Sequence, residues 1–383
     1  MAGPLAGLRV IEMSGIGPGP FCAMMLSDMG AEVIRIDRKS STAGSAFDEM
    51  KRNVVDRGRK SIALDMKQPG AAEVVLSLVE GADALIEGFR PGVMERLGLA
   101  PEMCWQRNPR LVYGRMTGWG QHGPLAACAG HDLNYIALSG ALGAMGYADR
   151  PPMPPLHLVG DMGGGAMMLA FGLVCALLEA RTSGKGQVVD AAISDGAASL
   201  STMYYGLMAQ GQWSSQRENN LLDGGAHFYG CYACADGKCI SIGSIEPQFY
   251  QQLIQLCALD ESLFKDQWAK GRWPELRQVL TEVFLTRSRD QWVQLLEGTD
   301  VCFAPVLDFS EAPQHPHNVA RQTFVEIDGV VQPAPAPRFS RTPGQAGRLS
   351  HPVDENGAAL LAALGLSPEA IEQWQRDGLI DAD

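Results

Sequence analysis

Two short segments carry the residue types from which an acid–base pair could be built. Ala129–Tyr135 places His131, the side chain that titrates nearest neutral pH, in a polar turn directly after a glycine. Leu158–Asp161 places a lone carboxylate, that of Asp161, at the end of an apolar run and just before a glycine-rich stretch. Taking a proton from the carbon next to a carbonyl, and returning one, requires a base and an acid on separate supports. We therefore interpret His131 and Asp161 as a proton-transfer pair that the fold brings together.

The elements that must position this pair are those of an α/β fold. The alternation of strands with helices predicts a large doubly wound, Rossmann-like domain, and after about residue 195 a hairpin and amphipathic helices predict a smaller α/β domain. Strands are predicted at 8–13, 32–36, 61–64, 84–86, 111–116 and 187–190, with helices at 21–29, 70–80 and 166–181. We predict a large domain over 1–195, a helical linker over 196–222, a small domain over 223–312, a proline-rich linker over 313–335, and a segment, 336–383, that returns to the large domain.

Composition excludes several classes of protein. The formal net charge of −12 argues against non-specific nucleic-acid binding. Nine scattered cysteines without a secretory signal indicate reduced thiols, and His227 with Cys231, Cys234 and Cys239 lacks the second cysteine pair of a zinc site, so no metal is expected. The longest uncharged run, 162–178, is shorter than the ~20 residues of a membrane span, and the chain ends without a peroxisomal tripeptide. These features predict a cytoplasmic protein.

The glycine-rich turn after the first predicted strand resembles a dinucleotide-binding fingerprint only in part. In Gly15–Pro20 the third glycine of the fingerprint is replaced by Pro20. Pro18 and Pro20 also lack the backbone N–H groups that a pyrophosphate would use. The turn therefore argues against nicotinamide or flavin binding.

Several collinear motifs resemble the family III CoA-transferase superfamily and, within it, the α-methylacyl-CoA racemases. These motifs run from the N-terminal turn to about Pro343 and are Gly15–Phe21, Leu64–Lys67, Asn108–Tyr113, Thr117–Gln121, Gly184–Asp190, Leu222–Ala226, Ile245–Tyr250 and Pro305–Val306. The resemblance implies an isomerase of fatty acid and lipid metabolism that works as an interlocked homodimer. Its active sites would form between the large, CoA-binding domain of one chain and the small domain of the other.

The resemblance also implies roles for individual residues. His131 and Asp161 match the racemases' catalytic residues, and Glu246 matches a glutamate that the second subunit brings to the site. The positions that match CoA contacts are Arg38, Leu64, Asp65, Met66, Lys67, Arg90, Gly130, Asp132, Leu133, Asn134 and Tyr135. Residues 35–67 hold nine Lys or Arg and five Asp or Glu, which predicts a basic patch for the CoA phosphates. His157 and His227 depart from the racemase pattern, which bears on acyl-chain preference.

The chemistry expected of these residues needs no cofactor, since CoA is part of the substrate. His131 and Asp161 would invert a 2-methylacyl thioester through an enolate, with backbone N–H groups of the Asp161–Gly165 turn stabilising the enolate oxygen. The apolar surroundings of Asp161 predict a raised pKa. Two alternatives remain open: a CoA-transferase that uses Asp161 as nucleophile, and a non-catalytic CoA-ester-binding protein.

Overall fold

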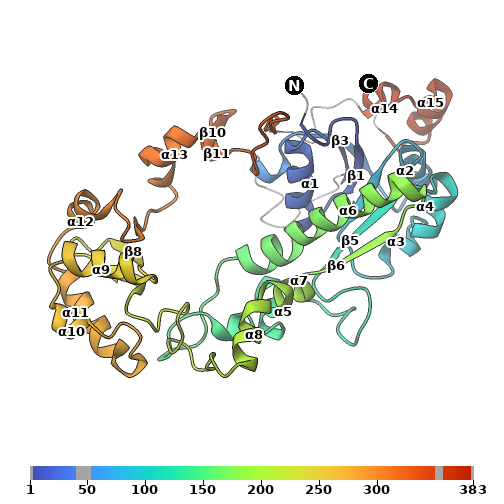
Figure 1. Cartoon of the computed structure of the whole chain (residues 1–383). Coiled ribbons are helices and arrows are strands. Elements are labelled where there is room, and N and C mark those ends of the chain that lie inside the picture. Colours follow the sequence, from blue (N-terminus) through green and yellow to red (C-terminus); the bar gives the residue numbers. More distant parts are fainter. Residues whose placement is uncertain (1–2, 40–52, 350–356, 381–383) are drawn as a thin grey trace. The chain divides into compact units, whose positions relative to one another are not determined.

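The computed structural model describes residues 3–39, 53–349 and 357–380, which form two compact units (Figure 1). The larger unit comprises Met1–Ser139, Leu156–Leu200 and Val319–Asp383. The smaller unit comprises Gly140–Pro155 and Ser201–Asn318. Each unit has its own hydrophobic core: two clusters of buried residues lie in the larger unit and one in the smaller unit.

A six-stranded parallel sheet forms the centre of the larger unit. Its strand order is β3-β2-β1-β4-β5-β6, as in doubly wound nucleotide-binding folds. The strands are β1 (Arg9–Met13), β2 (Glu32–Arg38), β3 (Arg59–Leu64), β4 (Ala84–Glu87), β5 (Val112–Thr117) and β6 (Val188–Ala192). This confirms the parallel α/β sheet predicted from the sequence. In such sheets, ligand-binding residues gather where the strands end.

Helices cover both faces of the sheet, which keeps its apolar strands away from water. On one face, α1 (Pro18–Asp28) and α6 (Met168–Ser183) pack on the sheet, with Leu169 and Leu173 fully buried. The opposite face is covered by α2 (Ala71–Val79), α3 (Val93–Arg96), α4 (Pro101–Arg107), α14 (Gly357–Ala363) and α15 (Pro368–Arg376).

One helix continues through the glycine-rich stretch that the sequence suggested as a turn. A ten-residue π-helix, η3 (Leu158–Met167), runs directly into α6. Within the described residues, this continuous helix (Leu158–Ser183) is the one long and apolar enough to span a membrane by length and composition. Its buried side packs on β5 and β6, as core helices of soluble proteins do.

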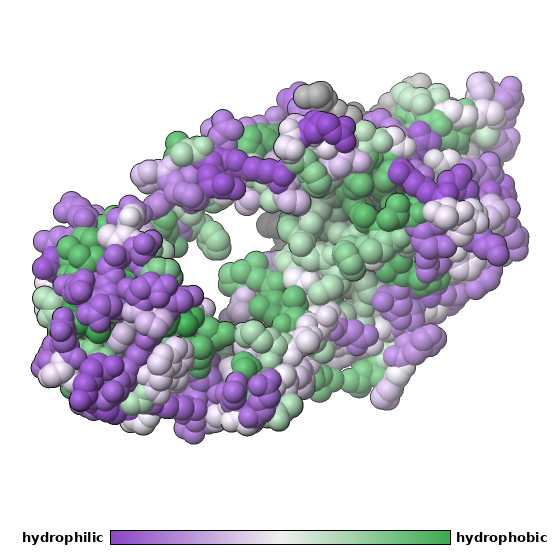
Figure 2. All heavy atoms as spheres, viewed as in Figure 1, coloured by the Kyte–Doolittle hydropathy of each residue, from purple (hydrophilic) through white to green (hydrophobic). Residues whose placement is uncertain are grey.

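The outward side of this helix presents an apolar stripe, visible as hydrophobic side chains gathered along α6 (Figure 2). Phe171 and Leu178 are 70% and 67% exposed, and Met167 and Val174 lie on the same stripe. Monomeric proteins seldom leave such a contiguous stripe uncovered.

Short elements complete both units. In the larger unit these are η1 (Val54–Asp56), α5 (Asp132–Leu138), α7 (Ile193–Leu200) and the hairpin β10 (Phe324–Ile327) and β11 (Val330–Pro333). The smaller unit has an antiparallel sheet of β7 (Tyr229–Ala233), β8 (Cys239–Gly243) and β9 (Phe303–Pro305). Its helices are α8 (Thr202–Ala209), α9 (Pro247–Leu256), α10 (Glu261–Phe264), α11 (Trp273–Phe284) and α12 (Arg289–Leu296), and α13 (Pro316–Arg321) follows.

Candidate active site

Asp161 lies in the first part of η3, half-buried, against the start of α1. Gly17, the residue before α1, has a positive φ of 70°, and a Cβ there would lie 3.1 Å from Oδ2 of Asp161. Burial, and after it the negative charge of Asp132, raise the pKa of Asp161 to about 6. The predicted rise in its pKa is therefore present, and its first cause is the predicted one.

Asp132 is the nearest anionic neighbour of Asp161. Its Oδ1 accepts a hydrogen bond from the backbone N–H of Asp161 at 2.6 Å. This approach requires Gly160, because a Cβ at that position would overlap the Asp132 carboxylate. The other oxygen, Oδ2, is buried and accepts no hydrogen bond within the described residues. Two carboxyl groups thus share one weakly solvated site, an arrangement that favours protonation of one of them.

His131 lies at the start of the same helix that carries Asp132. It is the N-cap residue of α5, its backbone N–H donates to Oδ1 of Asn134 at 3.0 Å, and its side chain is exposed. A positive charge on His131 or His157 would lower the pKa of Asp161, so both imidazoles lie within electrostatic reach of the carboxyl. The fold therefore brings His131 and Asp161 into one region, although 30 positions separate them in sequence.

An aromatic pair holds the segment that carries His131. Tyr135 packs edge-on against Trp119, with ring centroids 4.7 Å apart, and its hydroxyl donates to the carbonyl of Gly130. Burial and the charge of Asp161 raise the pKa of Tyr135, whereas Arg90 lowers it. Asp161 and Arg90 are thus both close to the Tyr135 phenol.

The backbone donors expected around Asp161 are already in use. The N–H of Asp161 donates to Asp132, and the N–H of Met162 donates to the carbonyl of His157 at 3.2 Å. The prediction that N–H groups of the Asp161–Gly165 turn bind an enolate oxygen is therefore wrong for these two donors. The physical reasons differ: the N–H of Met162 is bonded along the helix, whereas the N–H of Asp161 is taken by a carboxylate of α5.

The predicted CoA-contacting residues follow the carboxyl ends of neighbouring strands. Arg38 is paired with Leu64 in the register of β2 and β3, and both are the last residues of their strands. The turn after β3 is closed by a hydrogen bond from the N–H of Lys67 to Oδ1 of Asp65, which leaves Lys67 exposed. Arg90 follows β4 and is also exposed.

The remaining predicted CoA contacts lie in the turn after β3 and on helix α5. Met66 packs against the hydrophobic core beneath the turn after β3. Leu133 and Asn134 lie exposed on α5.

Much of the basic stretch, however, is not a phosphate patch. Arg57 and Arg59 are buried, and they pair with Asp28 at 2.5 Å and Glu12 at 3.0 Å. Arg35, also largely buried, pairs with acidic residues on both sides, Asp37 and Asp56. The prediction of one continuous basic surface is wrong for these three arginines, because net charge along the sequence does not report which cations are neutralised inside. Part of the stretch, 40–52, lies outside the described residues.

A second buried charged group was not foreseen from the sequence. Glu87, the last residue of β4, is 3% exposed and accepts the backbone N–H of Phe89 at 2.8 Å. The guanidinium of Arg115, on β5, lies 3.6 Å from Glu87 and also binds Glu95 at 2.6 Å and Gln121 at 2.8 Å. This group ties together the loops that follow β4 and β5, which carry Arg90 and Trp119. An acidic residue at the end of a buried strand is the signal that could have found it.

The third predicted catalytic residue, Glu246, belongs to the smaller unit, where it is the N-cap residue of α9. His227 is in the same unit and is fully buried. Its Nε2 lies 2.7 Å from the hydroxyl of Tyr250 on α9, and burial, together with nearby arginines, lowers its pKa to about 3. His227 is thus a core residue and does not face a substrate within this unit.

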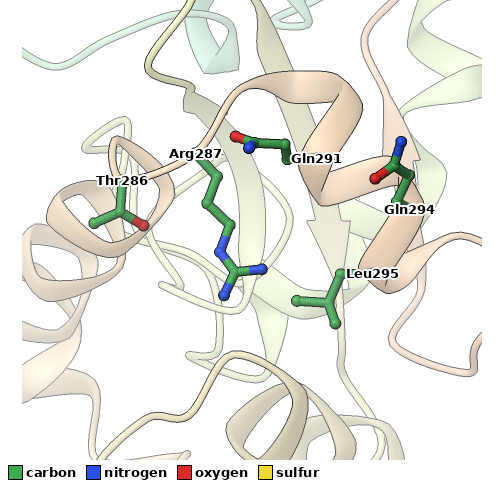
Figure 3. A pocket seen from close by; sticks show the side chains of 5 residues that line it. All are labelled: Thr286, Arg287, Gln291, Gln294 and Leu295. Atoms are coloured by element: carbon green, nitrogen blue, oxygen red, sulfur yellow. The ribbon is translucent and has the colours of Figure 1, made fainter.

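A shallow cavity of about 360 Å³ on the smaller unit contains none of the predicted residues (Figure 3). It is lined by Thr286, Arg287, Gln291, Gln294 and Leu295. The guanidinium of Arg287 lies 5.0 Å from the ring centroid of Trp292. No carboxylate, histidine, cysteine or lysine lines this cavity, so we do not assign it to catalysis.

The parallel sheet, with strand order β3-β2-β1-β4-β5-β6 and helices on both faces, defines a doubly wound α/β protein. Residues 5–355 match the family model of CoA-transferase family III, and the chain belongs to this family. The family predicted from the motifs is thereby confirmed.

Individual relatives extend over almost the whole chain. The chain is 42% identical over 382 residues to the alpha-methylacyl-CoA racemase of Mus musculus, covering 99% of this chain and 98% of that protein. Identity to the corresponding racemase of Homo sapiens is 41% over 381 residues, with the same coverage. The acetyl-CoA:oxalate CoA-transferase of Acetobacter aceti is 30% identical, covering 96% and 97%. Among solved structures, a CAIB/BAIF family protein from Brucella suis matches with a TM-score of 0.78 and 26% identity, over 95% of this chain and 100% of that one.

Proposed function

We propose that this protein inverts the α-carbon of 2-methylacyl-CoA thioesters, as an α-methylacyl-CoA racemase. The observation that carries the proposal is the half-buried Asp161 carboxyl, whose pKa is about 6, on the helix next to the one that His131 begins. The names of the relatives that are 41% and 42% identical support the same activity.

The proposed reaction has two proton transfers: the α-proton is removed to give an enolate, and a proton is then returned to the α-carbon. Neutral His131 takes the α-proton, the electron pair of the C–H bond moves into the thioester to form an enolate, and protonated Asp161 donates to the opposite face. The re-formed C–H bond has inverted configuration, and the opposite enantiomer uses the two groups in exchanged roles. Each positioned proton transfer contributes about 10²–10⁴-fold to the rate.

CoA is proposed to lie over the carboxyl ends of β2, β3 and β4. Arg38 and Lys67 offer exposed cations there for phosphate groups. Arg90 is placed nearer to the reacting pair, because both Arg90 and Asp161 influence the pKa of Tyr135. Each of these three cations would make its own charge-assisted hydrogen bond to CoA, without a broad basic surface.

We also propose that the active enzyme is a homodimer in which a second copy supplies Glu246. The exposed apolar stripe on α6 supports a partner surface, and a second copy is the occupant implied by the motif resemblance. Phe171→Glu should give a monomer in sedimentation velocity with little activity, whereas an unchanged dimer would exclude this stripe from the interface.

The test of the reaction is incubation of one enantiomer of a 2-methylacyl-CoA in D₂O without an acceptor acid. We expect α-deuterium incorporation together with loss of optical purity in the wild type. His131→Asn and Asp161→Asn should each stop inversion and leave CoA binding intact. His122→Asn, at an exposed histidine outside the pair, is the matched control and should behave as wild type. Normal inversion in either variant of the pair would refute the assignment.

A second candidate function is CoA transfer with Asp161 as nucleophile. Membership of the CoA-transferase family and 30% identity to an oxalate CoA-transferase support this second function. It predicts that hydroxylamine traps an enzyme-bound thioester and that turnover needs an acceptor acid. If CoA moves to an added acid while the α-hydrogen stays in place, this second function replaces the first.

A further inference from the structure

The start of α1 packs against η3, close to the Asp161 carboxyl. A Cβ on Gly17 would lie 3.1 Å from Oδ2 of Asp161, and one on Gly165 would lie 3.1 Å from Cβ of Pro18. The first turn of α1 therefore lies against the part of η3 that holds the carboxyl.

The first turn of a helix normally presents free N–H groups, and a carboxylate placed there is held in its ionised form. Here Pro18 and Pro20 have no N–H, and the N–H of Phe21 donates to the carbonyl of Gly17 at 3.3 Å. Gly19 alone retains an N–H among the first three positions of α1. Within the described residues, the carboxyl oxygens of Asp161 accept no hydrogen bond from any group.

We propose that Pro18 and Pro20 are positioning residues that keep this helix start poor in hydrogen-bond donors, so that the Asp161 carboxyl can take up and hold a proton. The inference rests on the proposed function for its biological meaning, since an acid that returns a proton to the enolate must be protonated for part of each cycle. A conventional helix start would bind the ionised form and withdraw Asp161 from that role.

The groups that act on Asp161 from the elements packed around it are the other contributors to its proton affinity. From α5 these are Asp132, Tyr135 and the N-cap His131, and His157 precedes η3. The packed elements carry six further charged residues. Asp195 is exposed on α7, Arg115 donates to the side chain of Gln121, and Asp190 accepts from the N–H of Gln121. Glu179 and Arg181 lie in the second half of α6, and Asp28 lies at the far end of α1. None of these is changed by substitution of the prolines.

The test restores the missing donors one at a time. Pro18→Ala and Pro20→Ala each return an N–H, and Pro18→Val returns the same N–H while keeping side-chain bulk against Gly165. Gly19→Ala is the matched control in the same turn, because it keeps its N–H and its Cβ would meet nothing within 4 Å. Pro368→Ala, at the first position of α15, controls for the effect of a new N–H on an unrelated helix.

The primary readout is a ¹³C NMR titration of the Asp161 carboxyl in aspartate-labelled protein, assigned with Asp161→Asn. We expect the titration midpoint to move down by about one pH unit in the proline variants, the size of one hydrogen bond to an ionised group. It should stay in place in Gly19→Ala and Pro368→Ala. The pH profile of α-deuterium exchange should shift in the same direction.

Two results would overturn the inference. One is an unchanged midpoint in folded Pro18→Val and Pro20→Ala proteins. The other is a shift in Pro18→Ala that Pro18→Val lacks, because lost packing would then be the cause. The titration needs no turnover, so it decides the inference even if the enzyme fails to racemise the thioester and the proposed function falls.

Discussion

The buried carboxyl of Glu87 makes the stability of the folded protein depend on pH. Burial, offset in part by the N–H of Phe89 and by Arg115, raises the pKa of Glu87 from 4.5 to about 7. Its side chain is 3% exposed, so little solvent screens this effect. Arg115 compensates incompletely, because it lies closer to Glu95 than to Glu87.

The direction of the pH effect follows from this raised pKa. The folded protein binds the proton on Glu87 more tightly than the unfolded chain does. The stabilisation of the folded state that results is fully present below pH 4.5 and is lost as the pH rises to about 7. At 1.36 kcal/mol per pH unit, the ionised side chain costs the folded state about 3 kcal/mol above pH 7 and less than about 1 kcal/mol at pH 5. Glu87→Gln keeps an acceptor for the N–H of Phe89 and carries no charge to bury. We therefore expect Glu87→Gln to gain about 2.5 kcal/mol more over wild type at pH 8 than at pH 5.

The assay is urea unfolding of the wild type and Glu87→Gln at pH 5 and pH 8, followed by near-ultraviolet circular dichroism. Glu80→Gln is the matched control, since Glu80 is 51% exposed and lies on the surface beside Arg107. Its effect should be small and similar at both pH values. Equal gains of Glu87→Gln at both pH values would refute the burial argument, because a change in packing has no reason to follow the proton.

Three further predictions concern the site. Asp132→Asn keeps the acceptor for the N–H of Asp161 but removes the negative charge beside it, so the pKa of Asp161 should fall below about 6. An unmoved pH profile of α-deuterium exchange would contradict the coupling of the two carboxyl groups. Gly17→Ala puts a side chain at φ 70° and 3.1 Å from Oδ2 of Asp161, so unfolding measurements should show a loss of about 1–2 kcal/mol and kcat should fall by at least about tenfold. Arg38→Gln should weaken CoA-ester binding about tenfold in calorimetry and leave kcat unchanged, whereas a fall in kcat alone would place Arg38 elsewhere.

Strand positions were predictable because the parallel strands are short apolar runs bounded by turns. The strand predicted at 61–64 is β3 (Arg59–Leu64), and the one predicted at 84–86 is β4 (Ala84–Glu87). The start of the long helix was predicted at 166, eight residues later than Leu158. Glycines usually weaken a helix, but here a Cβ on Gly196 would overlap the backbone of Gly164, and a Cβ on Gly164 would overlap the backbone N of Ala197. Close packing of two helices thus overrides the local tendency of these glycines to form a turn.

Side-chain types suggested the proposed acid–base pair, whereas burial decided which groups surround it. Sequence spacing indicated Asp161 and His131 but interpreted Asp132 only as a CoA contact, and the structure places its carboxylate on the N–H of Asp161. The same limit explains Arg57 and Arg59, whose acidic partners Asp28 and Glu12 come from distant segments. Charge is visible in a sequence, but its neutralisation depends on tertiary contacts between segments far apart along the chain.

The properties of Asp161 alone do not choose between the two chemistries of the family. Burial raises the pKa of Asp161 to about 6, near enough to neutral pH for the carboxyl to act either as an ionised nucleophile or as a protonated acid. A nucleophile must approach the thioester carbonyl, whereas an acid must face the α-carbon from the side opposite a base. His131 is the group that could be that base, since it begins the helix whose next residue, Asp132, contacts Asp161. The choice of reaction therefore depends on the histidine, and removing it should abolish inversion while leaving the ionised Asp161 able to act as a nucleophile.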